Sequence, residues 1–156
     1  MKNRAFTLIE LIFVLILVGI LGSTAAALFR PDRLLNDTKF ILAKIMKTRY
    51  EAIGYDHRNF DGSMTHAPIG CLRLQKGALE DNRSIAGSYR MKESTAITFG
   101  GIGGNTICFD SLGRPHDGDF SLASLLHRPV DINVSNGKKT YSIIVYPVSG
   151  YVTMKY

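Results

Sequence analysis

A single carboxylate, Glu10, lies in an otherwise uncharged apolar segment near the N-terminus. The next ionisable side chain after it is Arg30. A carboxylate in apolar surroundings is costly unless a cation pairs with it, so such a residue is a functional hypothesis that needs a named partner. The apolar segment itself contains no basic side chain for this role. We therefore expect a positive charge on another molecule to meet Glu10.

The segment over residues 11–29 predicts a membrane-spanning helix, since a span needs about 20 residues. Each strongly apolar residue contributes about −0.3 to −0.6 kcal/mol to insertion, and a charge at the membrane centre costs about 2.5–3.5 kcal/mol. About a dozen such residues give on the order of −5 kcal/mol, and Glu10 lies near one end. Lys2 and Arg4 precede the segment and favour a cytoplasmic N-terminus, which places the C-terminal domain outside the cytoplasm.

The start of the chain resembles the N-terminus of type IV pilins and pseudopilins. The resemblance rests on a basic leader, residues 1–5, followed by Phe6-Thr7-Leu8-Ile9-Glu10-Leu11. It implies that a prepilin peptidase cleaves between Ala5, where the family usually has Gly, and Phe6, and then methylates the new amine of Phe6. It also implies that the Glu10 carboxylate meets the N-terminal amine of a neighbouring subunit during assembly. The implied partners are other pilin subunits, the peptidase, an inner-membrane assembly platform and the lipid bilayer.

Two other interpretations of this segment are open. An ordinary secretory signal peptide would be cleaved after Ala25-Ala26-Ala27 and would release a soluble periplasmic protein. A plain membrane anchor would keep its whole N-terminus and would leave Glu10 unexplained. A mature chain that starts at Phe6 indicates a pilin, one that starts at Leu28 a signal peptide, and one that starts at Met1 an anchor.

The two cysteines, Cys71 and Cys108, both lie in strand-like surroundings. Outside the cytoplasm such residues pair readily, so we expect a disulfide, which would contribute about 3–4 kcal/mol by closing the loop between them. The alternative is two buried thiols that pack as small apolar residues.

Other reactive groups show no recognisable catalytic or metal-binding pattern. An EF-hand built around Gly62 would place Pro68 at its last ligand position, so it fails. Asp110, Asp117 and Asp119 could converge on a cation, although a solvated acidic loop explains them more simply. The histidines stand singly, and the glycine-rich residues 100–104 lack the Lys-Ser/Thr of a phosphate loop. We expect no enzyme activity, no metal and no cofactor.

Two Asn-x-Ser triplets, at Asn82 and Asn133, have an acidic residue two positions earlier, as some bacterial glycosylation systems require. Chance occurrence is the favoured interpretation of both. The formal net charge is +6, and it becomes +4 (17 basic against 13 acidic side chains) if Lys2 and Arg4 leave with the leader. This mildly basic balance permits contact with nucleic acid or anionic lipid without requiring either.

The periodicity predicts an α+β fold. One long helix is expected over residues 6–54, transmembrane in its first half and amphipathic in its second, with a bend at Pro31 and Gly54 at its end. It would pack on an antiparallel β-sheet or sandwich whose last two strands form a hairpin around residues 147–150. The predicted strands cover residues 69–75, 95–99, 105–109, 130–134, 140–146 and 150–155. The expected parts are the leader 1–5, the membrane and filament-core helix 6–29, and a periplasmic globular domain 30–156.

Residues 107–114 and the closing hairpin resemble the GspH/FimT branch of pseudopilins. This implies a minor pseudopilin of type II secretion, or of type IV pilus biogenesis, in the bacterial inner membrane. The rival is a DNA-binding minor pilin of a competence system, because some FimT-like proteins bind DNA through Gly-Arg-x-Arg after the final glycine. Neither arginine follows Gly150 here. One interpretation is a basic DNA-binding patch with Tyr151 or Tyr156 for stacking, formed by Arg90, Lys92, Lys138, Lys139 and Lys155. Lysines that protect a solvated strand edge explain these residues more simply.

Overall fold

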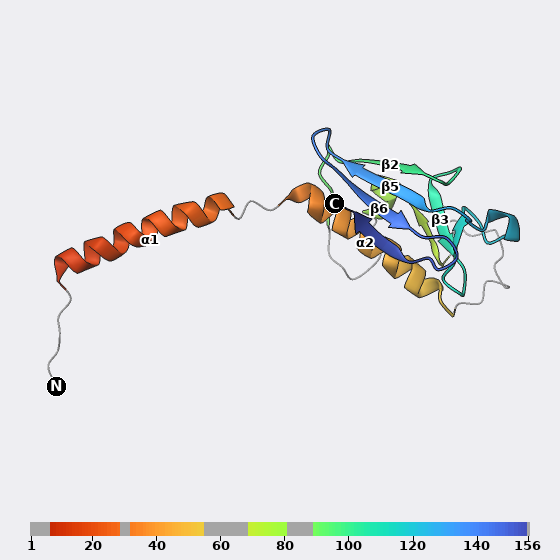
Figure 1. Cartoon of the computed structure of the whole chain (residues 1–156), viewed down its shortest axis with the longest axis horizontal. Coiled ribbons are helices and arrows are strands. Elements are labelled where there is room, and N and C mark those ends of the chain that lie inside the picture. Colours follow the sequence, from red (N-terminus) through yellow and green to blue (C-terminus); the bar gives the residue numbers. More distant parts are fainter. Residues whose placement is uncertain (1–6, 29–31, 55–68, 81–88, 156) are drawn as a thin grey trace. The chain divides into compact units, whose positions relative to one another are not determined.

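The computed structural model describes residues 7–28, 32–54, 69–80 and 89–155 (Figure 1). The chain divides into two compact units, Met1–Asp32 and Arg33–Tyr156. The first unit contains helix α1 (Leu8–Leu28), and the second contains helix α2 (Arg33–Ala52) and all the strands.

The prediction of one continuous helix over residues 6–54 is wrong. α1 ends at Leu28, α2 begins at Arg33, and Asp32 lies in neither helix. Pro31 supplies the physical reason, because proline has no N–H to donate and disfavours the helical conformation of the residue before it. The two halves of the expected rod are therefore separate helices.

α2 is amphipathic, as the sequence predicts. Leu34, Ile41, Ile45 and Ala52 recur on one face and are at most 3% exposed. This face packs on strands of both sheets. The helix ends where expected, because Gly54 adopts a φ of 83° and donates its N–H to the carbonyl oxygen of Ser111 at 3.1 Å. Glycine reaches this left-handed conformation without the steric cost that a side chain would bring.

The strands form two antiparallel sheets. The first has the order β1-β3-β4, with β1 at Cys71–Arg73, β3 at Thr106–Phe109 and β4 at Pro115–Asp117. The second has the order β2-β5-β6-β7, with β2 at Ala96–Gly100, β5 at Val130–Ser135, β6 at Thr140–Val145 and β7 at Val152–Lys155. A short helix α3 (Lys76–Leu79) follows β1, and a 3-10 turn η2 (Leu122–Ser124) precedes β5.

The core lies between the apolar face of α2 and the two sheets. Along β5, Val130, Ile132 and Val134 are fully buried while Asp131 is exposed, which is the alternation that a half-buried strand requires. The predicted α+β class is confirmed. β4 and α3 were not predicted; β4 reads Pro-His-Asp, which offers no apolar alternation and starts with a residue that is rare within sheets.

A disulfide joins Cys71 and Cys108. The two residues lie directly opposite each other on β1 and β3, with their Cα atoms 4.0 Å apart. Cys108 is fully buried and Cys71 is 9% exposed, so the bond is shielded from solvent and ties the two strands covalently.

Asp37 is a charged residue on the buried face of α2 and is only 2% exposed. One carboxylate oxygen accepts a hydrogen bond from the Tyr89 hydroxyl at 2.7 Å. The other accepts from the Thr95 hydroxyl at 2.6 Å and from the Lys92 N–H at 3.2 Å. These donors replace the water that a buried carboxylate loses. Asp37 thereby fixes residues 89–95 to the start of α2.

The hairpin between β6 and β7 is held at its turn by α2. The Arg49 guanidinium donates to the carbonyl oxygen of Ser149 at 3.0 Å and to that of Gly113 at 3.3 Å. Gly150 lies between these groups with a φ of 60°, and a Cβ there would overlap the Gly113 carbonyl oxygen. The predicted closing hairpin thus exists, and a three-way contact fixes its turn.

We expect Gly150→Ala to lower the free energy of unfolding by about 2–3 kcal/mol, because it adds a steric clash to the cost of a left-handed alanine. Gly137→Ala is the matched control. Its φ of 82° carries a similar conformational cost, but nothing lies within 4 Å of a Cβ there. Urea unfolding of both variants measures the difference; equal losses would show that the contact at Gly150 is not tight.

Candidate functional site

The first turn of α1 holds the carboxylate singled out by the sequence. The carbonyl oxygen of Thr7 accepts the N–H groups of Glu10 at 3.1 Å and Leu11 at 3.2 Å. The Thr7 hydroxyl lies 3.5 Å from a Glu10 carboxylate oxygen, at the outer limit of a hydrogen bond. Thr and Glu three residues apart form the capping-box pattern of a helix start, which the sequence analysis did not note. The Glu10 carboxylate is exposed and can meet a cation.

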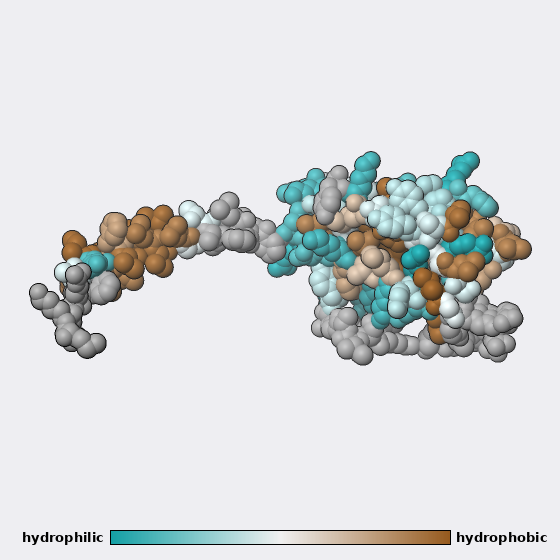
Figure 2. All heavy atoms as spheres, turned by 60° about the horizontal axis from the view of Figure 1, so that its bottom comes forward, coloured by the Kyte–Doolittle hydropathy of each residue, from teal (hydrophilic) through white to brown (hydrophobic). Residues whose placement is uncertain are grey.

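Past this turn α1 has no polar face. The large apolar side chains from Leu8 to Leu21 are 43–78% exposed, and Figure 2 shows the visible side of the helix covered by hydrophobic residues. The hydroxyls of Ser23 and Thr24 both donate to the carbonyl oxygen of Ile20, one turn earlier in the helix, at 2.9 Å and 3.1 Å. An exposed apolar surface of this extent marks a contact with protein or membrane.

Within the part of the chain that the structure describes, no helix combines the length and the apolar character that crossing a membrane requires. The span predicted over residues 11–29 stays a prediction.

The other residues predicted as sites are dispersed. Ala5, Phe6 and Asn82 lie outside the described residues. Asn133 lies in β5, where its side-chain oxygen accepts a hydrogen bond from the Ser142 hydroxyl at 2.6 Å.

The acidic residues considered for a cation do not converge. Asp117 accepts the Gly103 N–H at 2.6 Å, and Asp119 accepts the Ser121 N–H at 2.8 Å. Among the described residues no three metal-ligating side chains form a group that could hold an ion.

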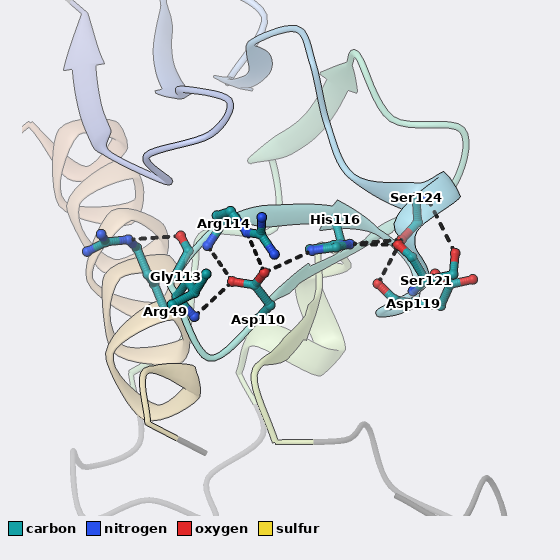
Figure 3. Close-up of polar contacts among 9 residues, drawn as sticks. Arg49, Asp110, Gly113, Arg114, His116, Asp119, Ser121 and Ser124 are labelled. Atoms are coloured by element: carbon teal, nitrogen blue, oxygen red, sulfur yellow. Dashed lines mark hydrogen bonds and ion pairs between the residues drawn. The ribbon is translucent and has the colours of Figure 1, made fainter. Parts of the chain in front are cut away.

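Asp110 is instead the centre of a polar network (Figure 3). One of its oxygens accepts the N–H groups of Leu112 at 3.0 Å and Arg114 at 2.8 Å. The other accepts the Arg114 side chain at 2.7 Å and lies 3.4 Å from Nε2 of His116. The network closes the turn between β3 and β4, next to the Gly113 carbonyl that Arg49 contacts.

His116 extends the network to Ser124, so that Asp110, His116 and Ser124 stand in a row (Figure 3). Nδ1 of His116 lies 3.0 Å from the Ser124 hydroxyl. The Ser124 hydroxyl also lies 2.8 Å from the carbonyl oxygen of Ser121 and 3.2 Å from that of Asp119, and Nδ1 of His116 lies 3.2 Å from the same Ser121 oxygen. The imidazole itself is only 2% exposed. The arrangement orders residues 110–124, and sequence reasoning missed it because the His and Ser carry no motif.

The network predicts an acid-sensitive stability. Burial acts to raise the pKa of Asp110, but the donors from Arg114, Leu112 and His116 outweigh it and hold the pKa below its ordinary value of 3.8. A lowered pKa contributes stability above the unfolded-state value that is lost as the pH falls through the folded-state value. We expect the urea concentration at the unfolding midpoint to decrease as the pH is lowered below about 4. In Asp110→Asn this decrease should be less steep. Asp131→Asn, at an exposed strand position, serves as the control; parallel pH profiles for wild type and Asp110→Asn would contradict this role.

Residues 1–26 match the family model of the prokaryotic N-terminal methylation motif. The chain therefore has the N-terminal segment of a type IV prepilin-like protein, and the motif implies a prepilin peptidase and other pilins as its partners. No curated protein and no solved structure gives a significant match.

Proposed function

We propose that this chain is a minor pseudopilin of the GspH/FimT branch. It is a structural, non-catalytic subunit that waits in the bacterial inner membrane and then enters a short periplasmic filament. The filament belongs to a type II secretion system or to the closely related type IV pilus system. One observation carries the proposal: an all-round apolar helix starts, within the methylation motif, with a turn that presents a carboxylate.

The apolar surface of α1 supports the two environments of such a subunit. Burying apolar surface is favourable by about 25 cal/mol per Å², so side chains as exposed as these require a cover. The bilayer covers them before assembly, and the α1 helices of neighbouring subunits cover them in the filament. Because the Ser23 and Thr24 hydroxyls bond within their own helix, they enter either environment without an unsatisfied group.

Glu10 supplies the specific contact. Cleavage after Ala5 creates a positively charged amine on Phe6, and that amine on one subunit pairs with Glu10 of the next. In apolar surroundings an ion pair removes much of the penalty that either charge alone would carry. The pairing positions each incoming helix against its neighbour.

The second unit faces the periplasm in this proposal. A disulfide between Cys71 and Cys108 fits that oxidising compartment. The closing hairpin of β6 and β7, preceded by the Gly113 turn, supports the resemblance to the GspH/FimT branch. The two-sheet unit offers surfaces to the other subunits and to the assembly platform.

The test is Glu10→Gln in the native host. Glutamine suits the capping position as well as glutamate does, so the start of α1 is preserved while the charge is lost. Breaking a buried ion pair costs about 3–5 kcal/mol, so we expect incorporation, measured by cross-linking to neighbouring subunits, to fall at least about 100-fold. Peptidase cleavage and membrane insertion remain intact.

Two controls separate the roles of Glu10. Thr7→Val removes the contact of the cap and keeps the charge, so it should assemble normally. N-terminal sequencing of the mature wild type should start at a methylated Phe6. Wild-type levels of assembly in Glu10→Gln would contradict the proposed contact, and a mature start at Leu28 or Met1 would contradict the proposed function.

A further inference from the structure

Six exposed basic side chains gather at one end of the second unit, the end at which α2 begins. We call them the basic cluster: Arg33, Arg90, Lys92, Lys138, Lys139 and Lys155. In Figure 2 hydrophilic residues cover this end of the unit.

Contacts within the unit bring the cluster together. Asp37, near the start of α2, binds the Lys92 N–H and the Thr95 hydroxyl. Thr95 leads directly into β2, whose first residue pairs with Ser135 at the end of β5. Lys138 and Lys139 lie in the turn that follows, and Lys155 lies opposite Ser142 near the start of β6. Figure 1 shows this turn and the C-terminal end of β7 at the end of the unit where α2 begins.

Among the described residues, the acidic side chains at this end, Asp32, Asp37, Glu80 and Glu93, are fewer than the six basic ones. The Asp37 carboxylate is buried under three hydrogen bonds, and Glu80 accepts the Met91 N–H at 2.7 Å. Glu93 is exposed. By contrast Asp110, together with the loop that holds Asp119, lies toward the C-terminal end of α2, where Gly54 contacts Ser111. The basic cluster therefore lies around the N-terminal end of α2, whereas Asp110 and Asp119 lie toward its C-terminal end.

The connection to α1 is short. α1 ends at Leu28 and α2 begins at Arg33, and this stretch spans at most about 18 Å even when fully extended. A membrane that holds α1 therefore keeps the start of α2, and the cluster around it, near its surface.

We propose that the basic cluster docks the globular unit onto anionic phospholipid headgroups of the membrane that holds α1. This inference rests on the proposed function. Each Lys or Arg close to an anionic surface adds to the attraction, which falls off within a Debye length. The turn that carries two of the lysines is preformed, because the Asn136 side-chain oxygen accepts the Lys138 N–H at 3.0 Å and the Lys139 N–H at 2.9 Å. Docking holds the unit at the surface until its helix joins a filament.

The test uses the full chain in two kinds of vesicle, one of phosphatidylcholine alone and one in which phosphatidylglycerol replaces part of it. A fluorophore on Ser94→Cys, an exposed position beside the cluster, reports contact with a quencher attached to the lipid headgroups. A fluorophore on Leu122→Cys, an 85% exposed position near Ser124, serves as the control label. We expect stronger quenching at Ser94 in the anionic vesicles, no change at Leu122, and loss of the difference near 1 M salt, where the Debye length is about 3 Å.

Charge reversal tests the residues. Lys138→Glu, Lys139→Glu and Lys155→Glu together should lower the docked fraction at least about tenfold. The control, Lys47→Glu with Arg128→Glu, reverses two exposed charges outside the cluster and should dock normally.

The outcomes separate this proposal from the proposed function. A chain that inserts in both vesicles but shows equal quenching at Ser94 overturns the docking alone. A chain that inserts in neither overturns the membrane role of α1. Displacement of the cluster from anionic vesicles by a short DNA duplex at low salt would assign it to nucleic acid and overturn the lipid proposal.

Discussion

Replacing Asp37 with alanine should lower the free energy of unfolding by about 4 kcal/mol, since it leaves the Tyr89, Thr95 and Lys92 donors without their acceptor. A hydrogen bond to a charged group contributes about 1.5–3 kcal/mol, and a buried donor left unpaired costs about 1–3 kcal/mol. Urea unfolding of the purified chain measures the loss. Tyr89→Phe removes one donor and should cost much less.

A second variant at this position, Asp37→Asn, has a spectroscopic readout. Burial, and then the hydrogen bond and the charge of Asp37, raise the pKa of Tyr89 to about 12 from its ordinary 10.0. A raised pKa contributes stability that is complete below the unfolded-state value and is lost as the pH rises through about 12. Ultraviolet titration of tyrosinate should show one tyrosine with a lower pKa in Asp37→Asn than in the wild type.

Asp131→Ala is the matched control, because this strand carboxylate is exposed. Its unfolding free energy should stay within about 0.5 kcal/mol of the wild type. An unchanged urea midpoint of unfolding in Asp37→Ala would show that the hydrogen bonds of Asp37 to residues 89–95 do not stabilise the unit.

Reducing the disulfide between Cys71 and Cys108 should lower the free energy of unfolding by about 4 kcal/mol, because the bond closes a long loop in the unfolded chain. The two residues are 37 positions apart in the sequence. Urea unfolding with and without reductant measures the effect. In the double variant Cys71→Ala and Cys108→Ala, the reductant should make no difference.

A reduced chain that unfolds at the same urea concentration as the oxidised chain would contradict this contribution. Loss of the midpoint difference after prolonged reoxidation would instead show that the bond re-forms between the same two cysteines, since the chain contains no others.

The N-terminal motif and the amphipathic α2 could be predicted because their signals are local. Pilin-like processing depends on consecutive residues around Phe6, and the apolar period of α2 recurs every three or four residues. The hairpin of β6 and β7 was predictable for the same reason, since its strands are joined by one short turn. Pro31 predicts a bend in one helix, whereas the structure has two helices with Asp32 in neither.

The polar contacts could not be predicted, because they join distant parts of the chain. The partners of Asp37 lie 52 to 58 residues away. One signal was present: Asp37 falls on the same helical stripe as Leu34 and Ile41, where a charge requires buried donors. For Asp110 and His116 no such signal existed, because β4, the strand that carries His116, is too short and too polar to be recognised.

The covalent link between β1 and β3 also changes what a single backbone cut can do. A protease that cleaves anywhere between Cys71 and Cys108 produces two fragments that remain one molecule. Such nicked chains would migrate as intact protein in a non-reducing gel and would separate only after a thiol is added.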